Sequence, residues 1–107
     1  MAPHRSATIP AAINFSSSGD NIVISAPAYG PINVYGLFFT VNGATNFYFK
    51  DSVVGQLSGT IVLTGNGSSQ TLPLQDEPYY FTQPGSNFVI NSSNAVTFGG
   101  TIWYTNG

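Results

Sequence analysis

Apolar and polar residues alternate with a period of two in one segment after another of this chain. In residues 56–64, for example, Leu57, Ile61 and Leu63 share one face of an extended strand, whereas the other face is polar except for Val62. No stretch of about eleven residues keeps the spacing of an amphipathic helix. Alternation of this kind is typical of antiparallel strands that pack one face and expose the other to water.

Turn-forming residues separate the alternating segments. Asn42-Gly43 lies between two of them and is a strong hairpin signal, because both residues tolerate positive φ. Gly65-Asn66-Gly67 separates another pair of segments. The strands expected between the turns are residues 8–15, 21–26, 32–41, 44–50, 56–64, 69–74, 87–91 and 96–105. About eight short strands with regularly spaced turns predict an all-β fold, an antiparallel β-sandwich of jelly-roll type.

We assign residues 1–10 to a flexible N-terminal arm and residues 11–107 to the single β-sandwich domain. Fixing ten backbone residues costs roughly 10–20 kcal/mol of conformational entropy. Burial of Met1 and Ile9 returns only about 1.5–3 kcal/mol for each side chain. The arm is therefore expected to be mobile unless part of it joins a sheet or a neighbouring chain holds it.

Some of the expected strands are apolar on both faces. Within residues 32–41, strict alternation places one apolar set on each face, namely Ile32, Val34 and Phe38 on one and Tyr35, Leu37, Phe39 and Val41 on the other. The last strand likewise places Trp103 opposite Ile102 and Tyr104. Because a two-layer sandwich buries one face of each sheet, the second face needs another cover. We predict an oligomer with Tyr35, Phe39 and Trp103 in its interface; the alternative is that loops or crossing sheets bury both faces within one chain.

The chain carries few charges, which excludes several classes of partner. Charged residues make up 6% of the sequence, against about 25% in ordinary soluble domains. Arg5 and Lys50 are its only strong cations, and two cations are too few to bind a nucleic-acid backbone. No segment has the roughly 20 apolar residues that span a bilayer, and the first residues lack the apolar core of a secretory signal. We expect no nucleic-acid or membrane partner and synthesis in a cytoplasm.

The residues that carry catalysis are also scarce. His4 is the only histidine and the chain has no cysteine, so we expect no nucleophilic triad, no metal site and no cofactor. Asp76 and Glu77 are adjacent, and adjacent side chains of an extended chain point in opposite directions, so they do not form a glycosidase pair. We therefore predict that the chain is not an enzyme. The segment with Asp76, Glu77, Tyr79 and Tyr80 is expected either to bind a sugar or to cap the core or a subunit seam.

Several segments together resemble known proteins. In chain order they are PINVYGLFF (31–39), NGATNFYFKD (42–51), LSGTIVL (57–63), PGSNFVIN (84–91) and AVTFGGTIWY (95–104). This order is similar to that of small virion proteins of tailed bacteriophages, over residues 31–105, in patterns of strands and turns rather than of chemistry.

The resemblance implies a virion component made in the host cytoplasm. It points to a capsid decoration (cement) protein, a homotrimer or another oligomer around a symmetry axis, bound to the major capsid protein or another virion protein. The alternative is a domain of a tail fibre, head fibre or spike that binds host surface glycans. The resemblance assigns a role to no individual residue.

Overall fold

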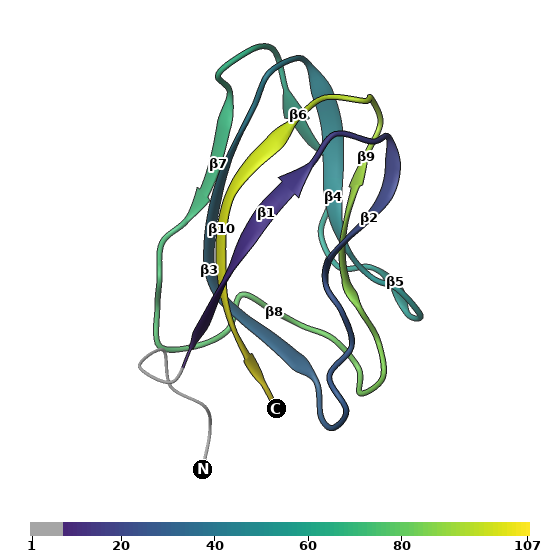
Figure 1. Ribbon diagram of the computed structural model, residues 1–107, viewed down its shortest axis with the longest axis vertical. Helices are drawn as coiled ribbons and strands as arrows, with labels where there is room; N and C mark the ends of the chain where they lie inside the picture. The colour runs from purple at the N-terminus through teal and green to yellow at the C-terminus, as the bar shows by residue number, and fades with distance from the viewer. Residues whose placement is uncertain (1–7) are drawn as a thin grey trace.

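The computed structural model describes residues 8–107, which form two antiparallel sheets packed face to face (Figure 1). Within this range there is no helix, and the predicted antiparallel β-sandwich is confirmed. The strands number ten rather than about eight: β1 (Ile9–Phe15), β2 (Gly19–Ile24), β3 (Ile32–Val41), β4 (Thr45–Asp51), β5 (Gly55–Gln56), β6 (Ile61–Leu63), β7 (Ser69–Leu72), β8 (Tyr80–Phe81), β9 (Phe88–Ser92) and β10 (Phe98–Asn106).

The order of the strands is that of a jelly roll. Sheet A runs β1-β10-β3-β7, with β8 also paired to β3, and sheet B runs β2-β9-β4-β5, with β6 also paired to β4. Strands from the two ends of the sequence therefore pair from the outside inward, as β1 with β10, β2 with β9, β3 with β7 and β4 with β6. An antiparallel ribbon paired in this way and wrapped around itself gives the two facing sheets of a jelly roll.

Apart from shifts of one or two residues at the ends of strands, three features differ from the sequence prediction. The predicted strand 56–64 is divided into β5 and β6, because the segment between them turns toward β4, where the Ser58 hydroxyl accepts the backbone N–H of Phe49 at 3.0 Å. The short strand β8 was not predicted. Strand β1 begins inside the predicted arm, since Ile9 and Pro10 pair with Tyr104 and Trp103. The remainder of that arm, residues 1–7, lies outside the described residues.

The turn at Asn42-Gly43 is not a hairpin, so that prediction is wrong. It connects β3 in sheet A to β4 in sheet B, and neither residue has a positive φ. The Asn42 side chain accepts the backbone N–H of Thr97 at 2.8 Å and so fixes the turn to the segment before β10. A Cβ atom on Gly43 would lie 3.0 Å from Val96 Cγ1. Packing, rather than the conformation of a hairpin turn, therefore favours glycine here.

A β-bulge in β3 changes which side chains face the core. Trp103 pairs with Gly36 and Tyr104 pairs with Val34, so Tyr35 is an extra residue of β3 between two consecutive pairs of the ladder. One extra residue reverses the alternation of the strand. As a result the apolar residues before the bulge and those after it join the same core, namely Ile32, Val34, Leu37, Phe39 and Val41.

Aromatic rings fill the space between the sheets. Phe39 of β3 contacts Phe47 of β4 edge to face, with ring centroids 5.1 Å apart, and Phe98 of β10 lies 5.0 Å from Phe39. Phe49 and Phe88 stack at 5.7 Å within sheet B. Edge-to-face and offset contacts at such distances stabilise a core beyond the area that they bury.

Two neighbouring glycines of β10 give a matched test of this packing. A Cβ atom on Gly100 would overlap the backbone of β3, including Phe39 Cα at 2.6 Å, whereas a Cβ atom on Gly99 would meet nothing within 4 Å. We expect Gly100→Ala to lower the free energy of unfolding by about 1–3 kcal/mol and Gly99→Ala to change it by less than about 0.5 kcal/mol. Urea unfolding followed by tryptophan fluorescence measures both, and equal stability of the two variants would contradict the β3–β10 packing.

Candidate interaction surface

The middle of the outer face of sheet A is apolar and uncharged. The ladders place Trp103 between Pro10 and Gly36, and Phe38 next to Thr101. The Phe38 and Trp103 rings are tilted against each other with centroids 6.2 Å apart. Phe38 keeps 44% of its surface exposed, and Trp103 is partly buried. We call the area formed by Phe38, Trp103, Pro10 and Ala12 the Trp103–Phe38 surface.

The segment that follows β7 borders this surface. A Cβ atom on Gly36 would lie 2.9 Å from Leu74 Cα, so the chain passes directly over Gly36. Only glycine permits such a close approach of two backbones. Leu74 itself is 39% exposed. It therefore adds an apolar side chain beside the Trp103–Phe38 surface.

Only one of the three predicted interface residues lies on an outer face. Tyr35 and Phe39 are 0% exposed within the single chain, and Phe39 packs in the core. The prediction that these two residues form a subunit interface is corrected accordingly, because strict alternation overlooked the bulge at Tyr35. The same oversight placed Phe38 on one face with Ile32 and Val34, whereas Phe38 is exposed and those two residues are buried in the core. Trp103 is placed as expected, since β10 has no extra residue and keeps its alternation.

The predicted sugar-binding or capping segment comprises part of the loop between β7 and β8 and the first residue of β8, Tyr80. The Tyr79 hydroxyl donates a hydrogen bond to the Pro73 carbonyl, and the Tyr79 backbone N–H donates to the Val34 carbonyl at 2.8 Å. The Tyr80 ring packs 5.1 Å from the Phe49 ring, and burial raises the pKa of the Tyr80 hydroxyl. Of the two roles considered for this segment, Tyr80 therefore has the second, because its ring packs against the core.

The two acids of this loop lie apart from the packed tyrosine. Asp76 and Glu77 are both exposed. The Gln75 side-chain amide donates to the Glu77 carbonyl at 2.9 Å, which helps to fix the loop. Sugar binding by this loop stays a prediction.

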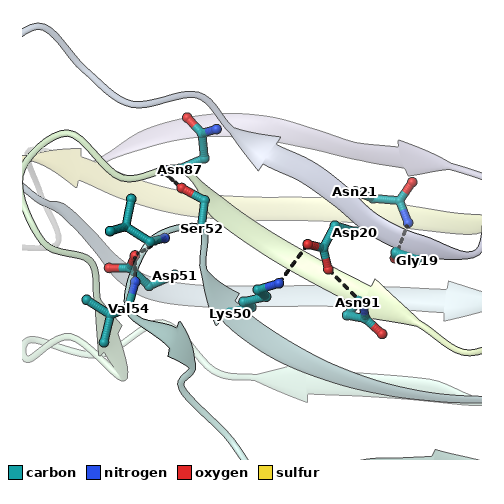
Figure 2. Close-up of polar contacts among 10 residues, drawn as sticks. Gly19, Asp20, Asn21, Lys50, Asp51, Ser52, Val54, Asn87 and Asn91 are labelled. Carbon is teal, nitrogen blue, oxygen red and sulfur yellow. Dashed lines mark hydrogen bonds and ion pairs between the residues drawn. The ribbon is translucent and has the colours of Figure 1, made fainter.

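The outer face of sheet B carries a charged cluster that spans three strands (Figure 2). Lys50 of β4 and Asp20 of β2 form an ion pair with Nζ and Oδ2 2.7 Å apart, and Asn91 of the intervening β9 donates to Asp20 Oδ1 at 2.7 Å. The Asn91 amide and the Lys50 ammonium lower the pKa of the Asp20 carboxyl. The same ion pair raises the pKa of Lys50. This face is thus charged where that of sheet A is apolar.

Asp51 is the buried carboxylate of the structure, with 1% of its surface exposed. Its Oδ1 accepts the backbone N–H groups of Val53 and Val54 at 2.8 and 2.9 Å, and its Oδ2 accepts that of Gln83 at 2.8 Å. Burial by itself would raise the pKa of Asp51, but these bonds and one from Ser86 outweigh it and lower the pKa. Asp51 therefore ties the turn after β4 to the loop before β9. Figure 2 shows Asp51 beside Val54 of that turn.

The sequence indicates Asp51-Ser52 as turn residues, but it does not indicate that Asp51 also joins two loops. An aspartate whose side chain accepts N–H groups two and three residues later is a common turn motif, so the turn was open to prediction. The bond to Gln83 joins residues 32 positions apart in sequence, and no local pattern indicates it.

Removal of the Asp51 carboxylate is expected to be costly. Asp51→Ala leaves three partly buried backbone N–H groups without their charged acceptor, and we expect a loss of about 3 kcal/mol in the free energy of unfolding. Asp20→Ala is the matched control, because an exposed ion pair contributes about 0–1 kcal/mol. Chemical unfolding at pH 7 compares the two variants. Equal losses would mean that the Asp51 hydrogen bonds do not hold the loops.

The lowered pKa of Asp51 also predicts a pH dependence. Because the folded pKa lies below that of the unfolded chain, the stabilisation is complete above about pH 4 and is lost as the pH falls toward the folded pKa. Asp51→Asn removes this contribution, so its stability should fall less steeply between about pH 5 and pH 2 than that of the wild type. The pKa of Asp20 is lowered too, so the stability of the Asp51→Asn variant should still decrease somewhat as the pH falls. Thermal unfolding across this range measures both profiles, and parallel profiles would contradict the assignment.

Among residues 8–107 we find no pocket and no group of three or more potential metal-ligating His, Cys, Asp or Glu side chains. The same residues contain no helix long and apolar enough to cross a membrane. No protein-family model matches the chain, and neither a curated protein nor a solved structure is significantly similar to it. Function must therefore be argued from the fold and from the surface of the chain.

Proposed function

We propose that this chain is a virion structural protein that binds the outside of a phage capsid and stabilises it as a homo-oligomeric decoration protein. The observation that carries the proposal is the Trp103–Phe38 surface, an apolar and uncharged area on an ordered sheet. The jelly-roll order of the strands supports it, because viral capsid and lectin domains use this architecture. The resemblance of residues 31–105 to small phage virion proteins points the same way.

The distribution of charge supports protein contact through sheet A. Interface centres are depleted of charged residues and enriched in aromatic ones. Phe38 and Trp103 provide two neighbouring aromatic rings. The charged side chains of the described residues lie elsewhere: Asp20, Lys50, Asp51, Asp76 and Glu77. The strands of sheet A therefore bring no charge of their own to a contact with a protein shell.

In the proposed mechanism, many bound copies each add a small contribution to the stability of the capsid. Each copy that binds only the assembled shell stabilises that shell by mass action. Phe38 and Trp103 are the anchors at the contact with the major capsid protein, since aromatic residues in the centre of an interface contribute most of its binding energy. The outer face of sheet B, which carries the ion pair of Lys50 and Asp20, then remains in contact with solvent.

The alternative, a fibre or spike domain that binds glycans, rests on Asp76, Glu77, Tyr79 and Tyr80. The structure uses the Tyr79 hydroxyl to close its own loop and packs the Tyr80 ring against Phe49. These contacts draw both aromatic side chains into the fold. No observation on the described residues favours this alternative over the decoration protein.

Phe38→Glu tests the proposed surface. A carboxylate in place of the exposed ring should reduce co-sedimentation with empty heads, assembled from the major capsid protein of the same genome, by about tenfold or more. Val62→Glu is the matched control, because Val62 is also exposed, at 64%, but belongs to sheet B. Circular dichroism confirms that both variants fold.

Two results of this experiment would count against the proposal, and they do so separately. Wild-type protein that neither binds heads nor raises their heat resistance rejects the decoration function. Phe38→Glu protein that binds as well as wild type leaves the function in place but rejects the Trp103–Phe38 surface as the contact.

A further inference from the structure

The four edges of the two sheets are protected to different degrees. Edge strands present unpaired backbone N–H and C=O groups, and natural proteins block them with charges, prolines, bulges or short strands. Sheet A ends at β1 on one side and at β7 and β8 on the other. Sheet B ends at β2 on one side and at β5 and β6 on the other.

Three of these edges carry such protection. β7 and β8 have four and two residues, and the loop between them contains two prolines and two acids. β5 and β6 have two and three residues. β2 carries the charged Asp20 and a register shift between Ile22 and Ile24. Each of these strands is therefore a poor template for a further strand.

β1 is the exception. It has seven residues, its ladder with β10 runs without a register shift from Ile9 to Phe15, and none of its side chains is charged. Beyond that ladder, the described residues give the backbone of β1 no hydrogen-bond partner. Pro10 is the sole protective residue, and it lies next to the beginning of the strand.

Pro10 also indicates which backbone groups face the free edge. Proline lacks an N–H, so within a paired strand it occurs where its backbone nitrogen points away from the neighbouring strand. Backbone groups of alternate residues point the same way in an antiparallel strand. We therefore expect Ala12 and Asn14 to direct their N–H and C=O groups away from β10, as Pro10 directs its C=O.

We propose that β1 pairs antiparallel with β1 of a second copy of this chain, about a two-fold axis at Ala12. This register places Ala12 opposite Ala12 of the second copy, Pro10 opposite Asn14 and Ile9 opposite Phe15. The Asn14 N–H then donates to the Pro10 carbonyl of the other copy. Pairing joins the two A sheets into one continuous sheet.

The side chains of β1 favour a second copy over an unrelated strand because they complement themselves. On the inner face Ile9, which is 42% exposed, meets Phe15, and Ala11 meets Ile13, so each contact is apolar. On the outer face the small Ala12 side chains meet at the axis and leave room for each other. Two-fold interfaces require this kind of match between a surface and itself.

This inference does not depend on the proposed virion function. It concerns the free protein in solution, and it predicts a dimer instead of the trimer that the resemblance implied. The Trp103–Phe38 surface would continue across the axis, since Pro10 and Ala12 belong both to that surface and to the paired edge.

Light scattering during size-exclusion chromatography of the full chain tests the pairing. The expected mass is twice the 11.3 kDa of one chain. Ala12→Lys and Ala12→Glu each place like charges opposite each other and should weaken the dimer by about fivefold or more. An equimolar mixture of the two variants should restore it, which a folding defect would not do. Thr40→Lys is the matched control, because Thr40 is exposed on the same face but belongs to β3.

Several outcomes would overturn the proposal. A wild-type monomer or trimer excludes the two-fold pair, and a dimer that Ala12→Lys leaves unchanged places the interface elsewhere. A wild-type monomer that dimerises only after deletion of residues 1–7 would show that this segment of the same chain occupies the edge. None of these measurements uses a capsid, so failure here and failure of the virion function remain distinguishable.

Discussion

The core depends on keeping the large side chains of β3 on one side of sheet A. β3 lies between β10 on one side and β7 with β8 on the other, so it is paired along both of its edges. The bulge at Tyr35 aligns Ile32 and Val34 with the apolar residues that follow it. A strand with unbroken alternation would turn these two side chains outward. The bulge also explains how a chain with two apparently apolar faces buries most of its apolar residues alone.

The architecture was accessible from the sequence because it follows from local patterns. Period-two alternation and frequent turn residues predicted an antiparallel sandwich, and the structure has that fold. The turn at Asn42-Gly43 shows what such patterns omit. A turn signal specifies that the chain reverses, whereas the choice between the same sheet and the opposite sheet depends on contacts with distant segments such as Thr97.

The candidate surface was predictable only where a strand is regular. Trp103 lies in β10, whose alternation is unbroken, and it was placed on the outer face as expected. Tyr35, Phe38 and Phe39 lie at or after the bulge, where strict alternation no longer predicts which face of the sheet a side chain joins. Asp51 shows the same limit for polar residues, because its bond to the Gln83 N–H depends on tertiary proximity. In both cases the environment of the side chain depends on contacts with segments distant in the sequence, and local alternation does not show these contacts.

The pairing of β1 with β10 has a consequence for biosynthesis. β1 leaves the ribosome before its ladder partner, which comprises residues 98–106. At roughly 5–20 residues per second, translation leaves β1 without its partner for several seconds. During that time an uncharged strand is open to nascent chains on the same messenger, and exchange of β1 between them would give intertwined products. A molecular chaperone that shields the first strand would keep each newly made chain folding on its own.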